Sequence, residues 1–583
     1  MERRVLIAIF LSFIVLYLYQ AVVVKPVPKP VTGAPTTASE PAKPGAPDAA
    51  SGAAQAAPQT PSGATPTTPA AATLIGDASE RDIRVETRDV VAVFTNRGAR
   101  IKSWRLKHFF DADKQPLELV TTGLQKTHPL PFSLHTPDEA INATLNGALY
   151  HVVSESGANS ATSTPVSLTF EYRDTAGIHA IKEFHLDPSS YIVGFRSAVT
   201  AGDRTLNPAV QWGPGLGDVT GETSRYIKKA EGIAFGAGKV QRFDPKAIAK
   251  QSTYTGDFTY AGVDDHYFLT VALFPGQSTV SYRPVTVPPP PNTKESPRDY
   301  VSYTIEPAHA GAPQKFFFGP KDFDILASIN RDLVRAIDYG MFSILVVPLL
   351  RSLKWVNGFV GNFGWSIVIL TIIINAIMFP LRHKSVVSMR KMQEIQPEVK
   401  AIQDRYSKLK ATDPGKQKMN QEMMALYKEK GVNPASGCVP MLLTMPVLFA
   451  FWSLLTYSIE LRGAPFFGWI HDLSVYDPLY IFPVLMGISQ VWQSRMTPSA
   501  AGTDPTQQKM MMYLMPIMMT FFFLWAPAGL ALYYLMSNLW GIGQQYATNY
   551  MIGPPTVRTV RPPAERRLKH VGGSKSEAAA RES

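Results

Sequence analysis

Long apolar runs and short alternating segments divide this chain into two kinds of structure. Between residues 80 and 320, apolar and polar positions alternate over short segments with turn residues between them, as in Val166-Ser-Leu-Thr-Phe-Glu-Tyr172. Period-two alternation predicts strands with one buried face. From 341 to 550 the apolar positions form long runs, which predict membrane helices. The pattern therefore predicts an all-β sandwich domain over 80–320 and a multi-span α-helical membrane domain after it.

The first apolar run, Val5–Val24, follows two arginines and is long enough to cross a bilayer, for which about twenty residues are needed. It lacks the shorter apolar stretch and small-residue cleavage site of a signal peptide. We therefore expect an uncleaved signal-anchor helix over 1–24. Residues 25–79 are rich in Pro, Ala and Thr, a composition that cannot bury a core, and they predict a disordered linker.

Five later runs are long enough to be helices that cross a membrane, which makes six spans with the anchor. They are 363–381, 439–458, 479–494, 510–526 and 528–547. The run Met341–Leu350 is shorter and contains Pro348, so within 321–360 we expect an amphipathic helix lying in the membrane interface. If this run crossed, the basic residues after 381 would fall on the outer side.

The net charge of +11 is concentrated in three places: before the first run, in 382–431 and in the tail 551–583. The positive-inside rule places all three in the cytoplasm, so both termini are expected there and 25–340 is expected outside. Single Cys438 excludes an intramolecular disulfide framework. No segment carries a specific nucleic-acid motif.

Apolar residues recur at steps of three and four on both sides of the turn signal Asp413-Pro-Gly415. They are Val399, Ile402, Tyr406 and Leu409 before the turn, and Met419, Met423 and Leu426 after it. This spacing predicts an antiparallel helical hairpin over 382–431, coated with Lys and Arg. Two roles stay open for its charges: a solvated face, or a docking surface for lipid headgroups, the ribosome or a nascent chain.

Two strings in the β region invite a nucleotide or metal interpretation. Gly236-Ala-Gly-Lys239 lacks the first glycine of a P-loop, and Val240 stands where Ser or Thr would contact magnesium, so the string predicts a turn. His179 and His185 have no metal-ligand spacing and predict ordinary strand histidines. We expect no cofactor, no metal site and no enzymatic activity; a sugar or a protein partner for the sandwich is left open.

Polar residues interrupt three of the apolar runs at similar depth. They are Thr371 and Asn375 in the first, Thr444 in the second, and Tyr533 and Tyr534 in the last. Taken singly, such a residue is more often a contact between helices. Because polar groups at membrane depth are costly unless they face protein or water, a set in three runs predicts a wet cavity inside the bundle.

Several motifs in 340–550 resemble the YidC-type membrane protein insertases. They are Gly361-Asn-Phe-Gly364, Met378-Phe-Pro-Leu381, Met392 to Pro397, Gln421-Glu-Met-Met-Ala-Leu-Tyr427, Val432-Asn-Pro434, Trp469-Ile-His-Asp-Leu-Ser474, Phe523-Leu-Trp-Ala-Pro-Ala-Gly529 and Leu532-Tyr-Tyr534. With the anchor and the outer β domain, the chain looks like the Gram-negative form. The resemblance implies a five-helix core over 361–550 that inserts nascent proteins into the bacterial inner membrane, alone or with the Sec translocon.

The resemblance also implies roles for single residues. Thr371 and Tyr534 match groove-facing residues, and three residues match a hydrophobic wall that contacts substrate: Met445, Pro446 and Leu448. The family usually has an arginine where this chain has Asn375. We expect Asn375 to keep the groove wet and three basic residues to supply charge at its mouth: Arg382, His383 and Lys384.

Two other classes of protein share some of these features. A transporter or channel would also need polar residues at mid-membrane, but it would normally carry paired charges or an ion site there, and none of the runs has a central Asp, Glu, Lys or Arg. A structural envelope protein would need only an anchor, and six spans with a basic hairpin exceed that. The insertase interpretation accounts for more of the chain.

Overall fold

The computed structural model describes most of the chain after residue 70. The described ranges are 71–111, 114–121, 128–156, 164–213, 228–287, 298–407, 413–432, 439–496 and 505–552. The predicted anchor 1–24, most of the linker and nearly all of the tail 551–583 lie outside them.

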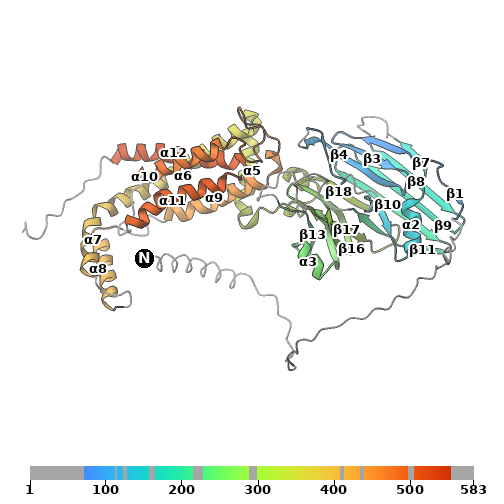
Figure 1. The fold of residues 1–583 in the computed structure, drawn as a ribbon, viewed down its shortest axis with the longest axis horizontal. Coiled ribbons are helices and arrows are strands. Elements are labelled where there is room, and N and C mark those ends of the chain that lie inside the picture. The colour runs from blue at the N-terminus through green and yellow to red at the C-terminus, as the bar shows by residue number, and fades with distance from the viewer. Residues whose placement is uncertain are drawn as a thin grey trace, which may run out of the picture. The chain divides into compact units, whose positions relative to one another are not determined.

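Residues 73 to 320 form two antiparallel sheets (Figure 1). Among the described residues the larger sheet has 14 strands: β1 (Thr73–Ile75), β6 (Ser133–His135), β7 (His151–Ser156), β8 (Val166–Asp174), β9 (Ile178–Leu186), β10 (Ile192–Ala201), β11 (Arg204–Leu206), β12 (Ala209–Trp212), β13 (Glu231–Gly236), β14 (Lys239–Phe243), β15 (Thr253–Asp264), β16 (Phe268–Val287), β17 (Arg298–Glu306) and β18 (Gln314–Pro320). The smaller has four: β2 (Asp82–Glu86), β3 (Val90–Thr95), β4 (Arg100–Phe110) and β5 (Pro116–Glu118).

The two sheets pack face to face, so the predicted β-sandwich is confirmed. In β8, every second residue is buried, as the alternation predicts. Phe94 of the smaller sheet meets Phe184 of the larger one edge to face, with ring centroids 5.0 Å apart. Trp104 of β4 donates from Nε1 to the carbonyl of Phe318 on β18, at 3.0 Å.

The turn expected at Gly236–Lys239 is confirmed: it joins β13 to β14, and Ala237 and Gly238 both have positive φ angles of 50° and 75°. That geometry is typical of a tight hairpin turn rather than a phosphate-binding loop. His179 and His185 both lie on β9, where they contact Glu171 and Ser167. One expectation was wrong: the last part of the linker contains strand β1, which pairs with β8.

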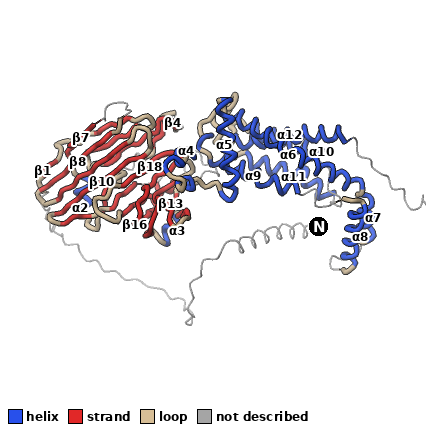
Figure 2. Tube along the Cα trace, turned by 180° about the vertical axis from the view of Figure 1, so that it is seen from behind, coloured by secondary structure: helices blue, strands red, loops and turns tan. Residues whose placement is uncertain are grey.

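Two short helices lie within the β region, and helices dominate the described residues after it (Figure 2). They are α2 (Glu139–Gly147) and α3 (Pro245–Lys250) within the β region, followed by α4 (Phe323–Ile329), α5 (Ser343–Val360), α6 (Phe363–Glu394), α7 (Gln396–Arg405), α8 (Gly415–Glu429), α9 (Val439–Tyr457), α10 (Ile481–Met496), α11 (Pro505–Phe523) and α12 (Ala528–Ile552). Short 3₁₀ turns cover Leu333–Ala336, Gly340–Phe342 and Ile459–Leu461.

The bundle and the hairpin follow the predicted runs closely. Helix α6 begins after Asn362, whose side chain accepts from the Trp365 N–H, and it continues past Pro380. In both views α7 and α8 lie at one end of the bundle and α5 at the other. The hairpin packs around Val399 and Val432, with Met423 and Leu426 against them, so the predicted antiparallel hairpin is confirmed.

By length and composition, two described segments are able to cross a membrane: Gly340–Val360 and Phe363–Glu394. Met445–Tyr457 and Met512–Phe523 are apolar but shorter, so the count of six spans stays a prediction. Helix α5 also extends ten residues beyond the Leu350 limit of the predicted run.

Both halves of α5 adjoin the β domain, which favours a helix along the interface. Near its start, Ser343 and Val347 line the same cavity as Arg242 of β14. Further on, Lys354 lies 3.3 Å from Asp322 beside the β domain and 2.9 Å from Glu460 after α9. Although burial lowers the pKa of Lys354, these carboxylates raise it above its ordinary value.

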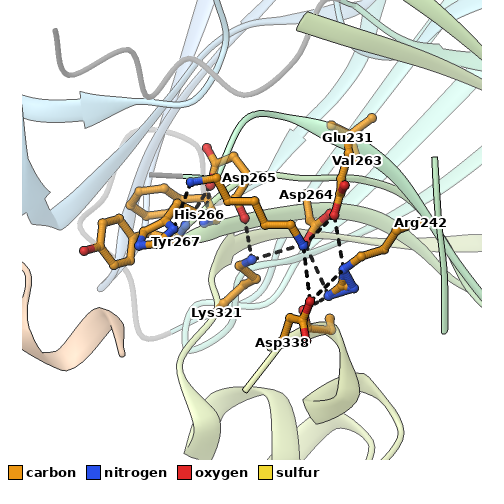
Figure 3. A network of polar contacts seen from close by, with 12 residues as sticks. Glu231, Arg242, Val263, Asp264, Asp265, His266, Tyr267, Lys321 and Asp338 are labelled. Carbon is orange, nitrogen blue, oxygen red and sulfur yellow. Dashed lines mark hydrogen bonds and ion pairs between the residues drawn. The ribbon is translucent and has the colours of Figure 1, made fainter. Parts of the chain in front are cut away.

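A polar network joins the β domain to the bundle (Figure 3). Lys321 forms an ion pair with Asp264 at 3.2 Å, and it donates to the carbonyl of Asp265. The next residue, His266, accepts at Nδ1 from the Lys228 N–H and donates from Nε2 to the carbonyl of Thr456 in α9, at 2.9 Å. Burial, and then the charge of Lys321, lowers the pKa of His266 to about 4.

Candidate functional site

A cavity of about 480 Å³ lies inside the helical bundle. Its polar lining comes from three helices: Asn375, Arg382 and Ser385 of α6, Gln493 of α10, and Tyr533, Tyr534, Ser537, Asn538, Gln544 and Gln545 of α12. Its apolar lining includes Ile374, Met378 and Val386 of α6 and Val447 and Leu448 of α9. Four helices therefore surround a space that is lined by both polar and apolar side chains.

Asn375 lines this cavity, whereas Thr371 does not, although they are one turn apart on α6. The Asn375 amide donates to the Thr371 carbonyl at 2.8 Å, which fixes the side chain against its own helix. The Thr371 hydroxyl donates to the Ile367 carbonyl at 2.6 Å, and the residue is fully buried. The structure thus separates two residues that the sequence placed in one set.

Tyr533 and Tyr534 both line the cavity, and aromatic neighbours hold both rings. Tyr533 stacks on Phe451 of α9, with ring centroids 4.4 Å apart. Tyr534 meets Phe523 of α11 edge to face at 4.9 Å. These contacts place two hydroxyl-bearing rings on a rigid part of the lining.

Of the three basic residues expected at the groove mouth, only Arg382 lines the cavity. It follows Asn375 by seven residues, or about 10 Å of helix. The His383 ring stacks on Phe379, and its Nδ1 lies 3.3 Å from the Thr548 hydroxyl. Lys384 is exposed. One fixed positive charge therefore belongs to the cavity itself.

The predicted hydrophobic wall on α9 is also divided. Leu448 lines the cavity, Pro446 lies inside the helix and is half-buried, and Met445 is exposed. Thr444 belongs to α9, but its side chain lies outside the described residues. The predicted wall thus lies on a different helix from the polar lining, and of its three residues only Leu448 reaches the cavity.

Most of the α12 contribution was not predicted from the sequence. Ser537, Asn538, Gly541, Gln544 and Gln545 follow one another at steps of one, three, three and one, so they continue the face that begins at Tyr534. Asn538 also donates to the carbonyl of Met486 at 3.2 Å, which ties α12 to α10. A search for helical spacing among polar residues in the last run would have found this face.

The cavity is closed toward the β domain. On that side Ile367 of α6, Leu454 of α9 and Ala531 of α12 are fully buried in one apolar cluster. Gly364 is packed so closely against Phe466 that an added Cβ would lie 2.0 Å from the ring. At the other end, Arg390 of α6 donates to the Asn549 side chain of α12.

The polar lining is incompletely satisfied by protein groups. Within the described part of the chain, the buried Oε1 of Gln544 has no hydrogen-bond partner. A buried carbonyl oxygen without a partner is costly, and a site that is polar and large enough takes up water. A cavity of about 480 Å³ is much larger than the roughly 10–15 Å³ that one water requires. The lining is therefore suited to hold water beside Gln544.

The family model described as 60Kd inner membrane protein matches residues 355–554, and the YidC periplasmic domain model matches 82–352. The membrane protein insertase YidC of Syntrophus aciditrophicus is 33% identical over 570 residues, covering 94% of this chain and 99% of its own. That of Geobacter metallireducens is 33% identical over 561 residues, covering 95% and 99%.

A solved structure, described as an active YidC insertase with its first transmembrane domain resolved, is 19% identical with a TM-score of 0.33, over 82% of this chain and 95% of that one. The sequence relatives carry the assignment, because they match both halves of the chain at 33% identity. The chain therefore belongs to the YidC family of membrane protein insertases.

Proposed function

We propose that the cavity between α6, α9, α10 and α12 is a hydrated groove through which this insertase moves short polar segments of nascent membrane proteins. As a member of the family, the chain is an inner membrane protein with a periplasmic domain. The observation that carries the proposal is the convergence of Asn375, Arg382 and the polar face of α12 on one cavity. Its apolar closure toward the β domain limits water to the cytoplasmic half.

The free energies of membrane insertion favour a groove that acts on the polar flank of a substrate. A twenty-residue apolar helix gains on the order of 6–12 kcal/mol on entering lipid, at about 0.3–0.6 kcal/mol per residue. One charged residue at the centre costs about 3 kcal/mol on the same scale. The barrier is therefore the passage of the flank, and a wet groove shortens the dry path that it crosses.

Arg382 supplies the positive charge that the family usually places at the position of Asn375. This role is supported by the position of Arg382, which lines the same cavity as Asn375 and lies about 10 Å further along α6. Attraction of an acidic flank would then begin nearer the cytoplasm. The membrane potential, negative inside, adds about 2.3 kcal/mol per 100 mV for one acidic residue moving outward.

The finer organisation of the chain is also part of this proposal. It comprises six spans, five of them in the core 361–550, with both termini in the cytoplasm and residues 25–340 outside. The basic hairpin and tail are placed to meet the ribosome or lipid headgroups, and the Sec translocon is a partner for larger clients. The charge distribution along the chain supports this topology and these roles of the basic segments.

Reconstitution into liposomes tests the proposal. The full chain should insert a small single-span protein without ATP and should pass no small solute. Asn375→Leu should slow insertion about tenfold, because it removes the polar group at the deepest part of the lining; Asn375→Gln should retain most activity. Solute flux would favour a channel, and equal insertion by Asn375→Leu would exclude the wet groove.

A further inference from the structure

A second cavity lies between α10 and α11, and none of its lining residues belongs to the proposed groove. Its volume is about 880 Å³, within the 300–1,000 Å³ that is typical of ligand sites. The large apolar side chains that line it are about half exposed: Val484, Ile488 and Trp492 of α10, and Ile517 and Phe521 of α11.

The apolar stripe of α10 ends in a positive charge. Val484, Ile488, Trp492 and Arg495 follow one another at steps of four, four and three, so they share one helix face. The Arg495 guanidinium lies 5.6 Å from the Tyr513 ring centroid, and its Nη2 is 3.3 Å from the Tyr513 hydroxyl. Within the described ranges no carboxylate forms an ion pair with it. An oriented guanidinium thus stands at one end of an apolar groove.

We propose that this groove binds one anionic phospholipid of the inner leaflet, with the phosphate at Arg495 and an acyl chain along the stripe toward Val484. Arginine binds phosphate oxygens with two parallel hydrogen bonds. The apolar stripe removes the acyl chain of the bound lipid from contact with other lipids. The inference goes beyond insertion, since it concerns a different face of the bundle.

The length of the groove favours a lipid over a protein partner. Val484 precedes Arg495 by eleven residues, or about 16 Å of helix. That distance matches one leaflet, since the whole hydrocarbon core is about 30 Å thick. A nascent transmembrane helix or a second copy of this chain would need a complementary face over the full thickness. Trp492 and Tyr513 near the charged end are typical of the membrane interface.

The floor of the groove is rigid. Gly487 is part of the lining, and a Cβ added there would lie 2.1 Å from the Thr520 hydroxyl of α11. The two helices therefore pack so closely at this level that a side chain at position 487 would require Thr520 to move. A preformed groove binds its ligand without the cost of ordering side chains.

Native mass spectrometry of the full chain tests this site. The protein is released from nanodiscs that contain phosphatidylglycerol and phosphatidylcholine with the same acyl chains. Arg495→Gln should weaken retention of phosphatidylglycerol about fivefold. The matched control is Lys391→Gln, which removes an exposed positive charge from α6 toward the hairpin end. Soluble glycerol phosphate should not displace the lipid, because it lacks the acyl chain.

A second variant tests the apolar part. Val491→Trp fills the groove and should reduce retention of both lipids, while insertion of a single-span protein shows that the variant is folded. A photoreactive residue at position 517 should yield a lipid adduct. Equal retention of phosphatidylglycerol by Arg495→Gln and Lys391→Gln overturns the proposal. So does displacement by glycerol phosphate, or capture of a nascent chain or a second copy at position 517.

Discussion

Two buried polar sites in this protein are built in opposite ways. In the sandwich, the Lys182 ammonium is fully buried and donates to the carbonyls of Gly98, Ala99 and Phe132, at 2.6, 3.3 and 2.9 Å. In the bundle, Asn375 and Gln544 are buried beside a cavity of about 480 Å³, and the Gln544 oxygen has no partner within the described residues. The Lys182 site is saturated by protein groups, whereas the cavity keeps a buried oxygen without a protein partner among the described residues.

A buried polar residue can stabilise the fold or line a cavity, and these two sites differ in this respect. Burial lowers the pKa of Lys182 well below its ordinary value, and Arg100 lowers it further, so this site is costly to charge. Its three acceptors come from two separate segments, which makes it a cross-link of the fold. The bundle cavity has one comparable tie, from Asn538 of α12 to the Met486 carbonyl of α10, but the Gln544 oxygen in its lining has no partner within the described residues. A buried polar atom without a protein partner beside a cavity of this size can bind water.

The largest effect on stability should come from removing the Lys182 amine. Lys182→Met leaves three buried carbonyls without a donor, and we expect the unfolding free energy of the β domain to fall by about 4 kcal/mol. Hydrogen exchange of the β9 amides in the full chain measures this. Lys315→Met, the same change at an exposed position of β18, should have almost no effect. Equal exchange in the two variants would contradict the role assigned to Lys182.

A somewhat smaller effect is expected on the pH dependence of stability. It concerns the junction between the β domain and α9, where His266 donates to the Thr456 carbonyl. Because the pKa of His266 is lowered to about 4 in the folded protein and lies near 6.5 when unfolded, the unfolded state binds more protons between these values. The stability of the junction is thus complete above pH 6.5 and falls by about 3 kcal/mol as the pH drops to 4. Thermal unfolding of the full chain across this range should show the slope.

The slope should disappear in His266→Gln, which does not titrate. Because Gln can still donate to the Thr456 carbonyl, this variant tests protonation rather than the loss of the contact. An unchanged slope in His266→Gln would assign the pH dependence to another group.

A third prediction concerns charge in the groove. Arg382→Gln should slow insertion of substrates with an acidic flank about threefold, and this loss should shrink at high salt. Lys384→Gln is the matched control, since Lys384 is adjacent but exposed and does not line the cavity. Insertion kinetics in liposomes at two salt concentrations measure both. If the two variants behave alike, the charge acts as part of a general basic surface.

The smallest effect separates the two polar residues of α6. Thr371→Val should change insertion by less than twofold, because its hydroxyl only donates within its own helix and does not reach the cavity. Its insertion rate is compared with that of Asn375→Leu in the same liposomes. A large loss in Thr371→Val would place the groove deeper than the cavity shows.

Hydrophobic patterning determined much of the architecture. The run 439–458 became α9 (Val439–Tyr457), and 528–547 became the first part of α12. The alternation around Val166 became β8 with every second residue buried. These predictions succeeded because a strand or helix that buries one face repeats apolar residues with its own period, and a period is written in the sequence.

Which polar residues share the cavity depends on how the helices pack against one another. Asn375 and Thr371 are equally polar and one turn apart, yet only Asn375 faces the space between α6, α9, α10 and α12. The three acceptors of Lys182 lie 50 to 84 residues away in the sequence. Such sets depend on how each element is rotated about its axis when it packs against neighbours. That rotation is fixed by contacts between distant segments, and no local pattern records it.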